Sequence, residues 1–221
     1  MKKITRVKIC GITNYDDAKN AADLGADYLG FNFYKKSQRY IAALKAKKII
    51  ENLSQKPQHC LNVAVFVNEP IDKIRDIIDF CRIDIIQLSG DEDADFMLKL
   101  KKSTNKKIIK TFRIRNTKKT FPDFDFRKSF FDYIMMDSFK KGFYGGTGAK
   151  FDWSIAKHVD KKRLFLSGGL NADNVGEAIK RIKPYAVDVC SGVEKSLGRK
   201  DFEKMKEFIY QVKLQKSERV V

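Results

Sequence analysis

Short runs of β-branched and aromatic residues alternate with helical patterns along almost the whole chain, and this alternation constrains the fold more than any other feature. We expect strands over residues 4–10, 28–33, 61–67, 83–88, 107–112, 133–137, 164–167 and 186–190. We expect helices over residues 14–24, 42–53, 70–80, 91–102, 152–158, 172–182 and 202–212. Strands that alternate with helices form right-handed βαβ units and a parallel sheet.

The number of these units selects a barrel over an open sheet. Eight units in 221 residues leave about 27 residues each, which predicts a compact (β/α)8 TIM barrel. A doubly wound open sheet is the alternative, and its dinucleotide-binding form needs G-x-G-x-x-G after the first strand. Here the first strand is followed by CGITNYDD at residues 10–17. No change of composition suggests a linker, so we expect a single domain over residues 1–221.

The chain is strongly basic, with 45 Lys and Arg against 28 Asp and Glu and a net charge of +17. Three interpretations are a lysine-rich surface without a specific role, steering of an anionic substrate, and nucleic-acid binding. The basic residues are spread along the chain, and no nucleic-acid-binding motif is found. We therefore expect no nucleic-acid partner.

The distribution of apolar residues and cysteines indicates a cytoplasmic protein. No run approaches the roughly 18 apolar residues of a membrane helix, and the N-terminus lacks the apolar core of a signal peptide. The four cysteines are far apart and form no C-x-x-C pair. We therefore expect no disulfide framework, no metal site, no membrane partner and a reducing cytoplasmic location.

Chemistry in such a barrel is expected at the C-terminal ends of the strands. The expected first and sixth strands end in Cys10 and Asp137. The two histidines, His59 and His158, do not lie at such ends. A thiolate and a carboxylic acid can act as base and acid if their surroundings shift their pKa values apart. Each also has a structural alternative, as a packed thiol or as a loop acceptor.

Glycine-rich turns follow the last three expected strands, and they indicate a phosphate site. Gly145, Gly146 and Gly148 follow the sixth strand, Gly168 and Gly169 the seventh, and Ser191 and Gly192 the eighth. Backbone amides in such turns can approach a phosphate closely. Tight turns without a ligand are the alternative interpretation.

The alternation of side chains along a strand predicts one buried ion pair. Lys8 points the same way as Cys10, and Asp188 the same way as Cys190. In a closed barrel the eighth strand borders the first. We therefore expect Lys8 and Asp188 to pair inside the barrel, because a lone buried charge is very costly. The ammonium would favour a Cys10 thiolate, and its pairing with Asp188 would weaken that effect.

Several motifs at these strand ends are similar to those of a known family. They are, in order, VKICGIT, LGFNFYKKSQRY, VAVFVNEP, IIQLSGDE, IMMDS with GGTGAKFDW, LSGGLNADNV and VDVCSGVE. Over nearly its whole length the chain resembles the phosphoribosylanthranilate isomerases of tryptophan biosynthesis.

The resemblance implies a (β/α)8 barrel that needs no cofactor and acts on a small, phosphorylated substrate that bears a carboxylate. The reaction would be the Amadori rearrangement of N-(5-phosphoribosyl)anthranilate to 1-(2-carboxyphenylamino)-1-deoxyribulose 5-phosphate. Cys10 would be the general base, Asp137 the general acid, and Arg39 the ligand of the anthranilate carboxylate. The amides around Gly146, Gly168, Gly169, Ser191 and Gly192 would hold the phosphate. The resemblance also favours a monomer.

Two positions depart from the family pattern. The family usually reads QLHG where this chain has Gln87, Leu88, Ser89 and Gly90, so Ser89 replaces an imidazole that contacts the substrate. Gln38 replaces a proline before Arg39. Gln87 and Ser89 are still expected to line the substrate site. The alternatives are another phosphosugar isomerase or epimerase, and an inactive barrel that acts as a binding protein.

Overall fold

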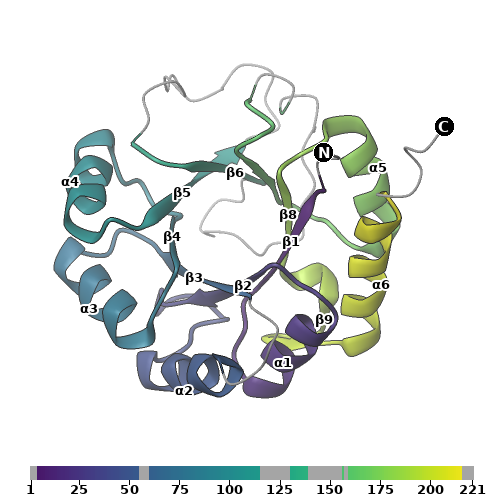
Figure 1. The fold of residues 1–221 in the computed structure, drawn as a ribbon, viewed down its shortest axis with the longest axis horizontal. Coiled ribbons are helices and arrows are strands. Elements are labelled where there is room, and N and C mark those ends of the chain that lie inside the picture. The colour runs from purple at the N-terminus through teal and green to yellow at the C-terminus, as the bar shows by residue number, and fades with distance from the viewer. Residues whose placement is uncertain (1–3, 55–59, 115–129, 139–155, 157–158, 216–221) are drawn as a thin grey trace.

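The structure is a computed structural model that describes residues 4–54, 60–114, 130–138, 156 and 159–215. Eight parallel strands close into a barrel in the order β1 to β8, and helices lie around its outside (Figure 1). The expected (β/α)8 barrel is therefore confirmed. The expected helix at 152–158, apart from residue 156, lies outside the described residues, as do both histidines and the glycines at 145–148.

All eight expected strands are present, with ends that differ by a few residues. They are β1 (Arg6–Cys10), β2 (Tyr28–Asn32), β3 (Leu61–Phe66), β4 (Ile85–Leu88), β5 (Lys107–Ile114), β6 (Tyr133–Ser138), β7 (Leu164–Leu166) and β8 (Ala186–Val189). β1 and β4 each begin two residues later than expected, and β5 continues two residues further, to Ile114, because its last residues pair with Asp137 and Ser138 of β6.

The described helices are α1 (Tyr15–Asp23), α2 (Ala43–Ser54), α3 (Ile71–Cys81), α4 (Ala94–Thr104), α5 (Ala172–Ile182) and α6 (Phe202–Leu214). Polar residues define several helix starts. The side chains of Asn14, Asp93, Asn171 and Asp201 each accept a hydrogen bond from a backbone amide of the first turn. Such caps satisfy amides that have no partner within the helix.

One segment was not expected from the sequence. After β8 the chain forms a short 3-10 helix, η2 (Ser191–Val193), and a hairpin of β9 (Glu194–Ser196) and β10 (Arg199–Lys200). Strands of two or three residues are too short to show a period in the sequence. This hairpin runs beside the start of α1, where the Thr13 hydroxyl donates to the Gly198 carbonyl over 2.5 Å.

The barrel has two packed regions. One lies between the sheet and the surrounding helices. The other fills the barrel interior with Tyr28, Val63, Ile85, Ile109, Met135, Phe165 and Ala186. Because side chains alternate along a strand, the inward residues that follow Tyr28 and Ala186 toward the C-terminal ends face the mouth. The apolar side chains therefore fill the barrel interior on the N-terminal side of the polar groups at the mouth.

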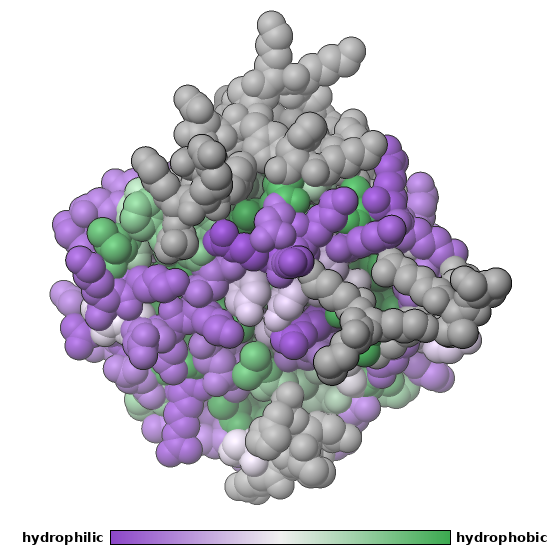
Figure 2. All heavy atoms as spheres, turned by 45° about the horizontal axis from the view of Figure 1, so that its top comes forward, coloured by the Kyte–Doolittle hydropathy of each residue, from purple (hydrophilic) through white to green (hydrophobic). Residues whose placement is uncertain are grey.

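On the face shown in Figure 2, hydrophilic side chains predominate over the described residues. This matches the scattered basic residues of the sequence. None of the helices in the described residues combines the length and the apolar character needed to span a bilayer.

Candidate active site

A cavity opens at the C-terminal ends of the barrel strands. About 700 Å³ of space in this region is not filled by protein atoms, and this volume includes some open solvent at the mouth. The described residues that line it are Cys10, Gly11, Asn32, Ser37, Arg39, Val65, Gln87, Ser89, Met135, Asp137, Ser167, Gly168, Gly169, Leu170, Asp188, Val189, Cys190, Ser191 and Gly192. The cavity thus brings together every expected site residue that the structure describes.

A buried ion pair lies beneath the cavity, as the sequence predicts. Lys8 and Asp188 are register partners on β1 and β8, and the Lys8 ammonium lies 2.6 Å from the Asp188 carboxylate. Lys8 is fully buried and Asp188 nearly so. Burial alone would lower the pKa of Lys8, but the Asp188 charge raises it above its ordinary value. Lys8 therefore keeps its positive charge inside the barrel.

Asp137 stands at the end of β6 and is buried. Its Oδ1 atom accepts hydrogen bonds from the Ser138 amide at 2.8 Å and from the Ser167 hydroxyl at 3.4 Å. Burial and the nearby Asp188 charge raise the pKa of Asp137 to about 6, although these hydrogen bonds work in the opposite direction. A carboxyl group with this pKa can donate a proton near neutral pH.

Cys10 ends β1 beside Lys8, and Gly30 of β2 leaves room for its thiol. A methyl group at Gly30 would lie 2.8 Å from the Cys10 sulfur. Burial raises the pKa of Cys10, and the Lys8 charge offsets this only in part. The ammonium therefore limits the cost of a Cys10 thiolate, while the thiol remains the more stable form.

The turns after β7 and β8 bring bare backbone to the cavity wall. Gly168 and Gly169 have φ of +88° and +68°, which is the left-handed region that glycine adopts without steric cost. A methyl group at Gly192 would lie 2.0 Å from the Leu170 carbonyl oxygen, so only glycine fits there. Gly168, Gly169, Ser191 and Gly192 all line the cavity. Gly146, the remaining residue expected at a phosphate, lies outside the described residues.

Ser89 and Gln87 form a polar group on β4 and the loop after it. The Ser89 hydroxyl lies 3.0 Å from the Thr111 hydroxyl and 3.1 Å from the Gln87 side-chain nitrogen. Thr111 and Gln87 are therefore the hydrogen-bonding neighbours of Ser89 in the cavity wall. Within the described residues, the Gln87 Oε1 atom is buried and has no hydrogen-bond partner.

Arg39 lies at the rim of the cavity and contacts a carboxylate of the chain itself. Its Nε and Nη2 atoms donate to the two oxygens of Glu194, at 3.2 and 2.7 Å. Lys200 also contacts Glu194, at 3.1 Å. Although burial would raise it, these two cations hold the pKa of Glu194 below its usual value.

Sequence reasoning missed Ser167, Glu194 and Lys200 as members of this site. Ser167 was recognised only as the end of a strand, yet its hydroxyl donates to Asp188 at 3.2 Å and contacts Asp137. Glu194 and Lys200 lie in the unexpected hairpin. Glu194 could have been found from its position in the motif VDVCSGVE, whereas Lys200 lies outside the motif.

The described residues offer no group of three or more His, Cys, Asp or Glu side chains arranged to hold a metal ion. The reactive groups that they do bring together are a thiol and a carboxylic acid above a buried ion pair. This fold and site place the chain among the (β/α)8-barrel enzymes that perform acid–base chemistry at the C-terminal ends of their strands.

Comparisons with known proteins identify the family. Residues 7–211 match the family model of N-(5'-phosphoribosyl)anthranilate (PRA) isomerase. Relatives of that name from Trichlorobacter lovleyi and Aquifex aeolicus are 43% and 45% identical, over 94% and 95% of this chain and 98% and 99% of theirs. A solved phosphoribosyl anthranilate isomerase in complex with reduced 1-(o-carboxyphenylamino)-1-deoxyribulose 5-phosphate has a TM-score of 0.77 and 36% identity. It covers 95% of this chain and 99% of its own.

The chain belongs to the N-(5'-phosphoribosyl)anthranilate isomerase family, and it is an isomerase. The family resemblance found in the sequence motifs is therefore confirmed.

Proposed function

We propose that this isomerase converts N-(5'-phosphoribosyl)anthranilate to 1-(2-carboxyphenylamino)-1-deoxyribulose 5-phosphate, in tryptophan biosynthesis, with Asp137 as general acid and Cys10 as general base. The observation that carries the assignment of roles is the joint position of the two groups. Both line one cavity, and the pKa of Asp137 is raised to about 6 while the pKa of Cys10 is raised above that of an ordinary thiol.

The first step is proton donation by Asp137 to the ring oxygen of the ribose. The C1–O bond then breaks, and the nitrogen lone pair forms the C1=N bond of a Schiff base. A carboxyl group with a pKa of about 6 is acidic enough to give up the proton and basic enough to be protonated in part of the molecules. Ser138 and Ser167 hold its Oδ1 atom in place.

Cys10, in its thiolate form, then removes the proton from C2 of the sugar and becomes the thiol. The electron pair of the C2–H bond forms the C1=C2 bond, and the electrons of the C=N bond return to nitrogen to give an enolamine. Protonation at C1 and loss of the hydroxyl proton at C2 give the ketone. The Lys8 ammonium beneath Cys10 stabilises the transient thiolate, since opposite charge at short range favours that form.

The substrate's two anionic ends and its hydroxyls have separate partners in this proposal. The amides around Gly168, Gly169, Ser191 and Gly192 bind the phosphate, as bare amides in glycine turns do in other barrels. Arg39 binds the anthranilate carboxylate, for which a planar guanidinium is suited. The unpartnered Gln87 carbonyl accepts a sugar hydroxyl, beside Ser89. We also propose that the chain is a single domain in the cytoplasm and a monomer; the mass in solution of the purified chain tests the monomer.

Turnover of phosphoribosylanthranilate by the purified protein tests the proposal, with loss of anthranilate-type fluorescence as the signal. We expect activity in the wild type, its loss in Cys10→Ser and in Asp137→Asn, and near wild-type activity in the control Cys60→Ser. Cys60 is half-buried and bonded to the Ala26 carbonyl, outside the cavity lining. An inactive wild type refutes the reaction, and a fully active Cys10→Ser refutes the assigned base.

A further inference from the structure

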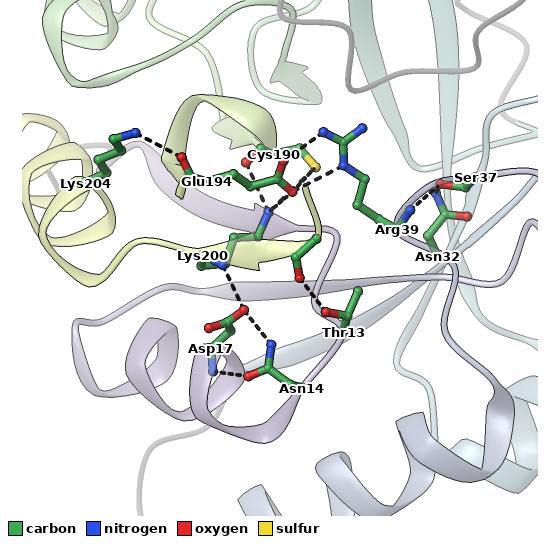
Figure 3. A network of polar contacts seen from close by, with 11 residues as sticks. Thr13, Asn14, Asp17, Asn32, Ser37, Arg39, Cys190, Glu194, Lys200 and Lys204 are labelled. Carbon is green, nitrogen blue, oxygen red and sulfur yellow. Dashed lines mark hydrogen bonds and ion pairs between the residues drawn. The ribbon is translucent and has the colours of Figure 1, made fainter. Parts of the chain in front are cut away.

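Three charged side chains meet at the rim of the cavity, and we call Arg39, Glu194 and Lys200 the rim cluster. The Glu194 carboxylate accepts two hydrogen bonds from the Arg39 guanidinium and one from the Lys200 ammonium at 3.1 Å. Figure 3 shows the two cations on either side of this carboxylate, with the Cys190 sulfur beside them. Arg39 reaches it from the loop after β2, whereas Glu194 and Lys200 belong to the β9–β10 hairpin.

The burial of the rim cluster makes its net charge matter. The side chains of Arg39, Glu194 and Lys200 are 13%, 6% and 0% exposed. Charges with so little access to water are screened weakly, so they act strongly on their neighbours. Two cations and one carboxylate give the cluster a net charge of +1. Without Lys200, Arg39 and Glu194 would neutralise each other.

Lys200 is held in place by several elements of the fold, unlike the scattered surface lysines. Its ammonium donates to the Cys190 carbonyl at 3.0 Å and lies 3.7 Å from the Cys190 sulfur. Its backbone amide donates to the Asp17 carboxylate at 2.9 Å. Asp17 in turn is bonded to Asn14 at the start of α1. These contacts hold the Lys200 ammonium in one position, against the Glu194 carboxylate and the Cys190 carbonyl.

The proposed function requires a second carboxylate at Arg39, that of the anthranilate ring. A carboxylate that meets a neutral Arg39–Glu194 pair gains little, because repulsion by Glu194 offsets attraction by Arg39. With Lys200 in the cluster, an incoming carboxylate completes a neutral set of two cations and two anions. The charge of Lys200 thus decides whether the arginine can serve both carboxylates.

We infer that Lys200 is a positioning residue that acts through Arg39: it balances the charge of Glu194 and so enables the guanidinium to bind the carboxylate of the substrate. This inference rests on the proposed function. Glu194 accepts hydrogen bonds from the guanidinium, and Lys200 supplies the excess positive charge.

Two ligands that differ only in the carboxyl group measure how much the carboxylate of the substrate contributes to binding. One is reduced 1-(o-carboxyphenylamino)-1-deoxyribulose 5-phosphate, and the other is the same compound without the carboxyl group. The ratio of their dissociation constants, measured by calorimetry, gives the carboxylate preference of each variant. Differences in folding or phosphate binding affect both ligands alike and cancel in this ratio.

Variants that change the cluster charge should change the preference in a fixed order. Lys200→Met brings the net charge to 0, and we expect the preference to fall about tenfold or more, the effect of losing one charged interaction. Glu194→Gln brings it to +2 and should raise the preference. The double variant Lys200→Met/Glu194→Gln returns to +1 and should recover wild-type preference. Lys204→Met is the matched control, since the ammonium of this exposed lysine donates to the Glu194 backbone carbonyl and not to its carboxylate in the described residues.

We also expect Lys200→Met to raise the KM and to leave kcat nearly unchanged, because Lys200 affects binding of the substrate carboxylate. Equal weakening of both ligands in Lys200→Met, or no recovery in the double variant, overturns the inference and shows a merely structural role. If Lys200→Met does not fold, Glu194→Gln still decides, because a lower preference there contradicts the charge argument. A wild type without any carboxylate preference instead refutes the proposed role of Arg39.

Discussion

The raised pKa of Asp137 predicts that Asp137→Asn is inactive and yet more stable than the wild type. The pKa of this carboxyl group is raised from 3.8 to about 6, chiefly by burial and then by the charge of Asp188. Each pKa unit corresponds to about 1.4 kcal/mol. Ionised Asp137 therefore costs the folded state roughly 3 kcal/mol. Asn keeps the Oδ1 acceptor for Ser138 and Ser167 and removes the charge.

The sign of this effect sets its pH range. Below pH 3.8 the Asp137 carboxyl group is protonated in both the folded and the unfolded state, so it does not change the free energy of unfolding. Between pH 3.8 and about 6 the unfolded chain releases the proton while the folded protein keeps it, so wild-type stability falls as the pH rises. Above pH 6 the full cost is present. The stabilisation by Asp137→Asn should therefore be about 2 kcal/mol larger at pH 8 than at pH 4.

Urea unfolding followed by circular dichroism at pH 4 and pH 8 measures this difference. The control is Asp76→Asn, which removes an exposed carboxylate of α3 and should show no such increase. A difference for Asp137→Asn that does not grow with pH, or a less stable variant at pH 8, would refute the reasoning. Activity lost together with stability would point to simple misfolding.

Three further predictions concern the barrel interior and the cavity wall. Lys8→Met should lower the free energy of unfolding by about 3–5 kcal/mol, because it leaves Asp188 buried without its partner; urea unfolding measures this, and Lys8→Met/Asp188→Asn should recover part of the loss. Gly192→Ala should raise the KM at least about tenfold, since the added methyl group would lie 2.0 Å from the Leu170 carbonyl oxygen and displace the turn; an unchanged KM contradicts the phosphate assignment. Ser89→His should lower the KM by restoring a ring contact to the substrate, and an unchanged or raised KM would show that the serine site is already compensated.

The pattern of strands and helices was readable because it is local. Side chains that alternate every two residues, or recur every three to four, leave a signal within ten residues of sequence. The exact residue at which a strand ends depends on its neighbours in the sheet. β5 extends to Ile114 because β6 supplies hydrogen-bond partners there. The β9–β10 hairpin left no periodic signal at all.

The sequence also determined part of the site, because the topology of a parallel barrel is so restrictive. Once eight parallel strands are inferred, their C-terminal ends must meet at one mouth. This alone brings Cys10 and Asp137 to the same cavity. The same rule, with side-chain parity, predicted the pair of Lys8 and Asp188 across 180 positions of the chain.

Other features depended on tertiary structure, because electrostatic partners are set by distance in space and by exclusion of water. Nothing near Asp137 in the sequence raises its pKa; burial and Asp188 on another strand do so. Likewise Arg39 was recognisable as a candidate carboxylate ligand, but its contact with Glu194, 155 positions away, was not. The sequence by itself determined the barrel, its mouth and the thiol and carboxyl group that lie there. Only the folded chain decided the charges around them, because it brings together groups with no regular spacing along the sequence.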